Sequence, residues 1–228
     1  MISVLIVAAG KGVRMGAVQP KQYLPLNGQA ILWHTLKAFD LCPVVDRIVV
    51  AVSSDQLQYC RHEVLGGQKL RSQLSLVEGG KHRQDSVFNG LEVLEEDGIV
   101  LIHDGVRPLV SVDLIQSCIH GAQRWGACIP VIEVTDTLKQ INEQGVIART
   151  VPRDTLRMAQ TPQAFEVGLI KEAHRLARRN HIQATDDASL VEQMGAAVHV
   201  IPGSVSNIKI TTPEDLQRAE MILVQGRR

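Results

Sequence analysis

The sequence has few aromatic residues and no net charge. Phe, Trp and Tyr account for 3% of its 228 residues, and 24 Lys and Arg balance 24 Asp and Glu. So few aromatic side chains provide no stacking platform for nucleic-acid bases. A neutral chain also lacks the long-range field that attracts nucleic acid or an anionic membrane surface. We therefore expect neither partner, and we expect any bound anion to be held by a local group of cations.

Cysteine is scarce, and long apolar runs are missing. The four cysteines, Cys42, Cys60, Cys118 and Cys128, show no C-x-x-C spacing, which argues against a zinc site and favours reduced thiols in a chain of this size. The N-terminal run "ISVLIV" is far shorter than the ~20 residues that span a membrane, and no basic region precedes it. The sequence predicts a cytoplasmic protein.

Apolar residues are plentiful, at 45% of the chain, and they fall in short β-branched runs. The runs "SVLIV", "RIVVAV", "GIVLIH" and "ACIPVI" lack polar alternation, and helical patterns separate them. Such strands are typical of parallel sheets with helices on both faces. No linker or internal repeat interrupts the chain. We therefore expect residues 1–228 to form one α/β domain with a doubly wound, mostly parallel sheet.

One segment departs from this pattern. Residues 134 to about 152, within "VTDTLKQINEQGVIART", read as two polar strands joined by a turn. An isolated hairpin of this size buries too little to be stable alone. We expect it to leave the sheet as an arm and to pack against another subunit, which predicts a homodimer.

Helix signals mark the C-terminal third. "TDDASLVEQMG" places Thr185 as an expected N-cap and Gly195 just after the helix end. "TTPEDLQRAEMIL" places Thr212 at an N-cap and Pro213 at the first helical position, where a missing N–H costs nothing.

A glycine-rich loop follows the first predicted strand. "VAAGKGVRMG" combines Gly10, Gly12 and Gly16 with Arg14, and Lys21 follows closely. Its spacing matches neither the dinucleotide fingerprint nor the P-loop, and the strand end "RIVVAVSS" contains no acid to bind a ribose. An NAD(P) oxidoreductase is therefore disfavoured. Two interpretations stay open at this point: a loop that wraps a nucleotide triphosphate with backbone N–H groups, or a turn with surface cations beside it.

Motifs along nearly the whole chain carry a resemblance. "AAGKGVRMG" with "PKQYLPLNGQAIL" is followed in order by "GGKHRQDSV", "HDGVRP", "VTDTLK", "RTVPR", "QTPQAF", "ATDDASLVE" and "NIKITTPEDL". This series resembles the 2-C-methyl-D-erythritol 4-phosphate cytidylyltransferases of the non-mevalonate isoprenoid pathway. The resemblance implies a Rossmann-like nucleotidyltransferase that joins CTP to 2-C-methyl-D-erythritol 4-phosphate, giving 4-diphosphocytidyl-2-C-methyl-D-erythritol and pyrophosphate.

The resemblance also implies roles for individual residues. Two cations stabilise the transition state: Arg14 and Lys21. The nucleotide contacts are Ala8, Ala9, Gly10, Gly12, Gly80, Arg83, Ser86 and Asp104. The acceptor contacts are Arg107, Thr137, Arg153, Thr185, Asp186 and Lys209. Arg153 and Thr137 would reach a neighbouring subunit's site on the arm. The implied cofactor is Mg²⁺, bound weakly by Asp104 and mostly by CTP phosphates.

The implied reaction needs cations and no protein nucleophile, because the acceptor's phosphate oxygen attacks while a dianion approaches a tetra-anion. Plainer roles remain for some residues, since Ser86 and Thr185 could each serve only to cap a helix. Two other functions remain as alternatives: a ribitol 5-phosphate cytidylyltransferase, which has a similar loop, and a nucleotide-binding protein without catalysis.

Overall fold

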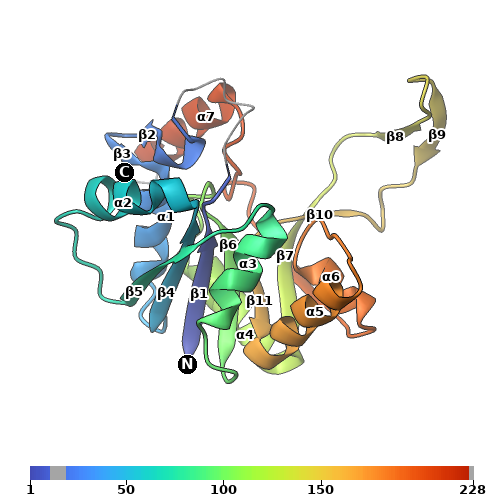
Figure 1. Ribbon diagram of the computed structural model, residues 1–228. Helices are drawn as coiled ribbons and strands as arrows, with labels where there is room; N and C mark the ends of the chain where they lie inside the picture. Colours follow the sequence, from blue (N-terminus) through green and yellow to red (C-terminus); the bar gives the residue numbers. More distant parts are fainter. Residues whose placement is uncertain (11–18, 226–228) are drawn as a thin grey trace.

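The computed structural model describes residues 1–10 and 19–225, and a mixed sheet forms its centre (Figure 1). In the described residues this sheet has eight strands in the order β10-β7-β11-β6-β1-β4-β5, with β12 also paired to β7. The parallel part comprises β1 (Ile2–Val7), β4 (Arg47–Val52), β5 (Gln73–Glu78) and β6 (Ile99–Asp104). The other strands are β7 (Ala127–Glu133), β10 (Arg157–Ala159), β11 (Gln163–Glu166) and β12 (His199–Pro202).

Strand β11 makes the sheet mixed. It runs antiparallel to both β6 and β7, between which it lies, and β10 is antiparallel to β7. The expected mostly parallel, doubly wound α/β sheet is confirmed with this addition. Strand β12 comes after the arm in sequence and pairs with β7, which precedes the arm, so both halves of the chain contribute to one sheet.

Helices cover both faces of the sheet because successive strand side chains point to opposite sides. Val4 and Ile6 pack toward α1 (Ile31–Asp40) and α4 (Val112–Trp125). Leu5, between them, packs toward the other face. That face is covered by α3 (Arg83–Glu92), α5 (Val167–Arg179) and α6 (Ala188–Gln193).

Smaller elements lie around the carboxyl edge of the sheet. They are η2 (Lys21–Tyr23), the β2 (Pro25–Leu26) and β3 (Gln29–Ala30) pair, η3 (Ser54–Gln56), α2 (Leu57–Tyr59) and the π-helix η4 (Cys60–Val64). The last helix, α7 (Pro213–Gln225), packs on the β2–β3 hairpin through a separate apolar cluster that includes Leu26, Ile210 and Ala219.

Three of the four predicted helix-end signals are confirmed. The Thr212 hydroxyl accepts the Asp215 N–H at 3.3 Å, and α7 begins at Pro213. Gly195 follows α6 with a φ of 79°, a left-handed conformation that glycine adopts without strain. The N-cap expectation for Thr185 is wrong, because α6 begins at Ala188 after Asp187. The helix begins later because the Asp186 carboxylate accepts the Ser189 N–H at 3.1 Å and forms a turn just before α6.

The predicted arm is present as a hairpin. Among the described strands, β8 (Leu138–Ile141) and β9 (Ile147–Val151) pair only with each other, and the hairpin projects away from the body (Figure 1). Exposed apolar side chains on it include Ile141 and Ile147, which are 61% and 59% exposed. So much exposed apolar surface on a two-stranded hairpin favours a protein partner for the arm.

The four cysteines are buried free thiols. Burial raises the pKa of Cys60 and of Cys128 to about 11, so these thiols stay protonated and unreactive at neutral pH. Among the described helices, none combines the length and apolarity needed to cross a membrane.

Candidate active site

A cleft opens where the carboxyl ends of β1 and β6 lie side by side. Val7 and Asp104 end these strands and are paired in register. The chain returns from the β5 edge to place β6 on the other side of β1, so this is the topological switch point, where open α/β sheets bind ligands. Around it stand Val7, Ala8, Ala9, Gly10, Lys21, Gln22, Gly80, Lys81, His82, Arg83, Ser86, Asp104, Val106 and Lys209.

The chain just after β1 forms the first wall of the cleft. Ala8, Ala9 and Gly10 line it, as expected, together with Lys21. The buried Gln22 donates from Nε2 to the Ala8 carbonyl at 2.6 Å, which ties η2 to the strand end and so places Lys21 at the cleft. Sequence reasoning missed Gln22. Gly12 and Arg14 lie outside the described residues.

The loop between β5 and α3 forms a second wall. The Gly80 N–H donates to the Ser86 hydroxyl at 3.0 Å, and that hydroxyl donates to the His82 carbonyl at 3.1 Å. Gly80 has no room for a side chain, since a Cβ there would lie 2.2 Å from the Asp85 Cβ. The structure thus brings Gly80 and Ser86 together, and His82, not Ser86, is the N-cap residue of α3.

Three cations surround the Asp104 carboxylate. Arg83 Nε lies 3.3 Å from Oδ1, while Lys209 Nζ and Arg107 Nε lie 2.8 and 3.5 Å from Oδ2. Burial alone would raise the pKa of Asp104, but Arg83, Lys209 and Arg107 outweigh it and hold that pKa far below its usual range. Asp104 is therefore ionised at neutral pH. Together with Asp187, which also pairs with Arg83, it offsets two of the three positive charges and leaves an excess of one.

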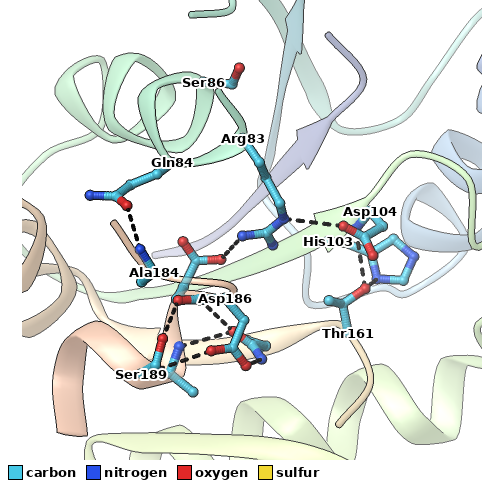
Figure 2. A network of polar contacts seen from close by, with 12 residues as sticks. Arg83, Gln84, Ser86, His103, Asp104, Thr161, Ala184, Asp186 and Ser189 are labelled. Atoms are coloured by element: carbon cyan, nitrogen blue, oxygen red, sulfur yellow. Dashed lines mark hydrogen bonds and ion pairs between the residues drawn. The ribbon is translucent and has the colours of Figure 1, made fainter. Parts of the chain in front are cut away.

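Arg83 has a second partner that the sequence analysis missed. Its Nη1 lies 2.7 Å from the Asp187 carboxylate, which the buried His174 also contacts at 3.1 Å. Burial would lower the pKa of Arg83, but Asp187 and Asp104 together raise it. The sequence motif had pointed to the adjacent acid, Asp186, but its carboxylate accepts hydrogen bonds from Gln163 and Ser189 (Figure 2). In the sequence, the one indication that Asp187 could serve here is the pair of consecutive acids in "TDDASL".

Behind Asp104 lies a buried polar chain (Figure 2). The Asp104 N–H donates to the Thr161 hydroxyl at 3.1 Å, and Thr161 lies 3.0 Å from His103 Nδ1. His103 Nε2 faces the Arg107 carbonyl at 3.0 Å, so Nε2 must carry the proton and Nδ1 accepts from Thr161. Burial lowers the pKa of His103 to about 4, so the imidazole is a neutral structural group.

The predicted acceptor residues fall in separate places within one chain. Lys209 lines the cleft. Arg107 lies beside it and donates to the Asn207 carbonyl at 2.7 Å. Arg153 lines a different groove with Glu133 and Asp154 and donates to the Thr135 carbonyl.

Thr137 is exposed at the base of the arm, and Thr185 is exposed before α6. Neither residue lines the cleft, and neither does Asp186.

The side chains around the cleft are poorly suited to holding a metal ion. Within residues 1–10 and 19–225, no group of three His, Cys, Asp or Glu side chains is placed to bind one. Asp104 is the one carboxylate lining the described part of the cleft, and three cations already engage it. Mg²⁺ prefers several oxygen ligands in octahedral geometry, and this donor set does not fit that need.

A cationic cleft at the switch point of a doubly wound sheet, lined by the start of the glycine-rich sequence at Gly10, is typical of an α/β enzyme that binds a nucleotide. The match to known families is specific: the model of the 2-C-methyl-D-erythritol 4-phosphate cytidylyltransferase family covers residues 2–225. The chain belongs to this family and is a cytidylyltransferase of the non-mevalonate isoprenoid pathway. The acceptor inferred from the motifs, methylerythritol phosphate rather than ribitol phosphate, is thereby confirmed.

Relatives resemble the chain over almost its full length. The enzyme of this name from Syntrophotalea carbinolica is 48% identical, over 97% of this chain and 96% of its own. That from Clostridium botulinum is 44% identical over 98% and 99%. The solved structure of the Thermus thermophilus enzyme, 38% identical, superposes with a TM-score of 0.78 and covers 96% of this chain and 97% of its own. The 4-diphosphocytidyl-2C-methyl-D-erythritol synthase from Anaerococcus prevotii reaches 0.84 at 32% identity, over 98% and 96%.

Proposed function

We propose that the cleft binds CTP along its β1 and α3 walls and the acceptor's phosphate beside Asp104, within a single domain that works as a dimer. The observation that carries this division is the charge around Asp104, where Arg83, Arg107 and Lys209 converge. Arg83 comes from the α3 wall, whereas Lys209 comes from the segment before α7. The Asp104 carboxylate thus holds Arg83, on the nucleotide side, close to Lys209, on the acceptor side.

On the nucleotide side, Arg14 and Lys21 stabilise the triphosphate and the charge that builds on the α-phosphate. The backbone of Ala8, Ala9, Gly10 and Gly12 adds N–H donors. Lys21 is well placed for this role, because Gln22 anchors its helix to Ala8 and Lys21 itself lines the cleft. A preorganised cation is effective since it does not reorganise as the charge develops.

At the α3 wall, Gly80 and Ser86 read the cytosine edge. The Ser86 hydroxyl already receives the Gly80 N–H and donates to His82, which holds it in one orientation. Cytosine offers an amino donor and two acceptors, so a fixed hydroxyl oxygen and backbone groups suffice to read it. Arg83 lies at the base of this wall, and Asp104 orients either the ribose or the acceptor's hydroxyls.

On the acceptor side, Lys209 and Arg107 attract the phosphate, and Arg153 with Thr137 completes the grip from the partner subunit's arm. This assignment explains why Arg153 and Lys209 lie in different pockets of one chain. Thr185 and Asp186 contribute from the loop before α6. An acceptor phosphate held between several cations can point one oxygen at the α-phosphorus in line with the leaving group.

In the reaction itself, the acceptor's phosphate oxygen forms a bond to the α-phosphorus of CTP. The bond from that phosphorus to the bridging oxygen of the β-phosphate breaks, and pyrophosphate leaves with the electron pair. No proton has to be removed from the nucleophile, since a phosphate monoester is already anionic at neutral pH. Mg²⁺ arrives as part of the MgCTP substrate, with phosphate oxygens as its main ligands.

The test compares Lys209→Met with Lys21→Met in pyrophosphate-release assays, with CTP and the acceptor varied separately. Lys209→Met is expected to raise the KM for the acceptor and to leave the KM for CTP close to wild type. Lys21→Met is expected to lower kcat on the order of 100-fold. If Lys209→Met raised the KM for CTP as much as the KM for the acceptor, the proposed division of the cleft would be contradicted.

A further inference from the structure

The segment "QTPQ", residues 160–163, lies behind the cleft and contacts three separate segments of the chain: the end of β6, the start of α6 and the loop of residues 203–207. Its polar side chains Gln160, Thr161 and Gln163 are all buried, and each reaches a different one of these segments. Thr161 accepts the N–H of Asp104, and Gln163 accepts the backbone N–H groups of Asp187 and Ala188. Gln160 faces the loop of residues 203–207, which leads to Lys209.

Gln160 binds this loop most closely at Ser204, and its side chain also makes two longer hydrogen bonds with Asn207, both 3.5 Å. Its Nε2 donates to the Ser204 carbonyl at 2.8 Å, and its Oε1 accepts the Ser204 N–H at 3.1 Å. The amide thereby pairs with the backbone as a neighbouring strand would. Gly203 permits the approach: a Cβ there would lie 2.5 Å from Gln160 Oε1 and 3.0 Å from the Val131 carbonyl oxygen.

Asn207 extends the contact toward the active site. It is fully buried and donates from Nδ2 to the Thr161 carbonyl at 2.8 Å. The backbone carbonyl oxygen of Asn207 accepts a hydrogen bond from Arg107 Nη1 at 2.7 Å. Beyond it, the Ile210 N–H donates to the Val106 carbonyl at 2.9 Å. Lys209 therefore lies between two anchored residues, with Nζ 2.8 Å from Asp104.

We propose that Gln160 is a positioning residue that sets Lys209 and Arg107 through the backbone of residues 203–207. This inference rests on the proposed role of Lys209 at the acceptor phosphate. Gln160 touches neither substrate, because it lies outside the set of residues that line the cleft. The segment it holds has no helix or strand of its own between β12 and α7, so side-chain contacts determine its course.

The primary variant is Gln160→Met, which keeps most of the side-chain volume and removes both contacts with Ser204. The kcat/KM for the acceptor is expected to fall by about tenfold or more, since small misplacements of a positioning group have large effects on rate. The KM for CTP is expected to stay unchanged. Gly203→Ala, which displaces the loop without removing a polar group, is expected to act in the same direction. Ser72→Ala, which removes a buried hydrogen bond to Val45 in another region, controls for a general loss of stability.

A double-mutant cycle with Lys209→Met decides how Gln160 acts. Because Gln160 acts through Lys209 and Arg107, Gln160→Met has less effect in the Lys209→Met background than in wild type, and the remaining effect is the part transmitted by Arg107. An undiminished effect in that background, or an equal rise of the KM for CTP, would overturn the positioning role. Lys209→Met with normal acceptor kinetics would instead overturn the assignment of Lys209 itself, so the two failures are distinguishable.

Discussion

Arg83 and Asp187 form a 2.7 Å ion pair across 104 residues of sequence. The pair joins the first turn of α3 to the residue before α6, and Arg83 extends from there to Asp104. The side chain of Asp187 is 1% exposed, and buried charges of this kind are costly to leave unpaired. The position of the guanidinium at the cleft therefore depends on a carboxylate outside the cleft.

We expect Asp187→Asn to destabilise the protein by about 2 kcal/mol, because Arg83 then keeps a single carboxylate partner, Asp104, which it shares with Arg107 and Lys209. The kcat/KM for CTP should also fall, since Arg83 loses one of its two anchors. Urea unfolding and steady-state kinetics measure both effects. Arg175→Gln is the control: it breaks an ion pair with Glu96 in which both side chains are exposed, so little effect is expected. Equal losses in the two variants would contradict the anchoring role.

His103 makes stability depend on pH in a defined window. Its pKa is about 4 in the folded protein against 6.5 for an ordinary histidine, so the unfolded chain binds more protons between these values. Stability is complete above pH 6.5 and is lost as the pH falls toward 4, by up to about 3 kcal/mol for this group. Asp104, whose pKa is depressed, adds a further loss below its ordinary value of 3.8.

The measurement is the free energy of unfolding of wild type and His103→Asn at several pH values from 7.5 to 4.5. The variant is expected to be less stable at pH 7.5, because it loses the contacts of the imidazole with Thr161 and Arg107. Its curve should fall less steeply with acid, since one titrating group is gone. Parallel curves for the two proteins would refute the buried neutral imidazole.

Active sites completed by the partner subunit predict complementation between inactive chains. In a mixed dimer of Arg14→Ala and Arg153→Ala, one site has its own Arg14 and receives Arg153 from the other chain. After subunit exchange of equal amounts, about a quarter of wild-type activity is expected, because half of the dimers are mixed and each has one intact site. Pyrophosphate release provides the readout. Mixing Arg14→Ala with Lys21→Ala, both assigned to the same chain's site, should restore none. Absence of recovery in the first mixture, with exchange demonstrated, would place Arg153 in its own chain's site.

The exposed side chains of the arm predict its role in assembly. We expect Ile147→Asp to shift the protein toward monomer and to reduce acceptor turnover, because a charge replaces apolar contact area on β9. Sedimentation and kinetics measure the two effects. The control is Met221→Asp on α7, where Met221 is 59% exposed, as is Ile147. This variant should change neither the oligomeric state nor the acceptor turnover. A dimeric, fully active Ile147→Asp variant would show that the arm is not needed for association.

Local and periodic features could be read from the sequence because their causes lie within a few residues. The β-branched runs predicted the sheet, Thr212 and Pro213 predicted the start of α7, and the polar hairpin predicted the arm. The expectation for Thr185 failed, although it was also local, since two consecutive acids offered competing ways to begin α6. The ordered series of motifs along the chain was also sufficient to indicate the family, which the comparisons confirmed.

Tertiary structure alone decided which distant residues meet. The residue pattern of β11 does not predict that this strand lies antiparallel between β6 and β7. The motif "QTPQ" likewise does not predict which three segments of the chain its side chains contact. The choice of Asp187 over Asp186 depends on the direction in which each carboxylate points after the chain turns into α6. Such choices arise from packing and from pairing buried polar groups across the whole fold. The sequence alone determined the elements and the chemistry of the site, whereas the folded chain decided how its charges are arranged.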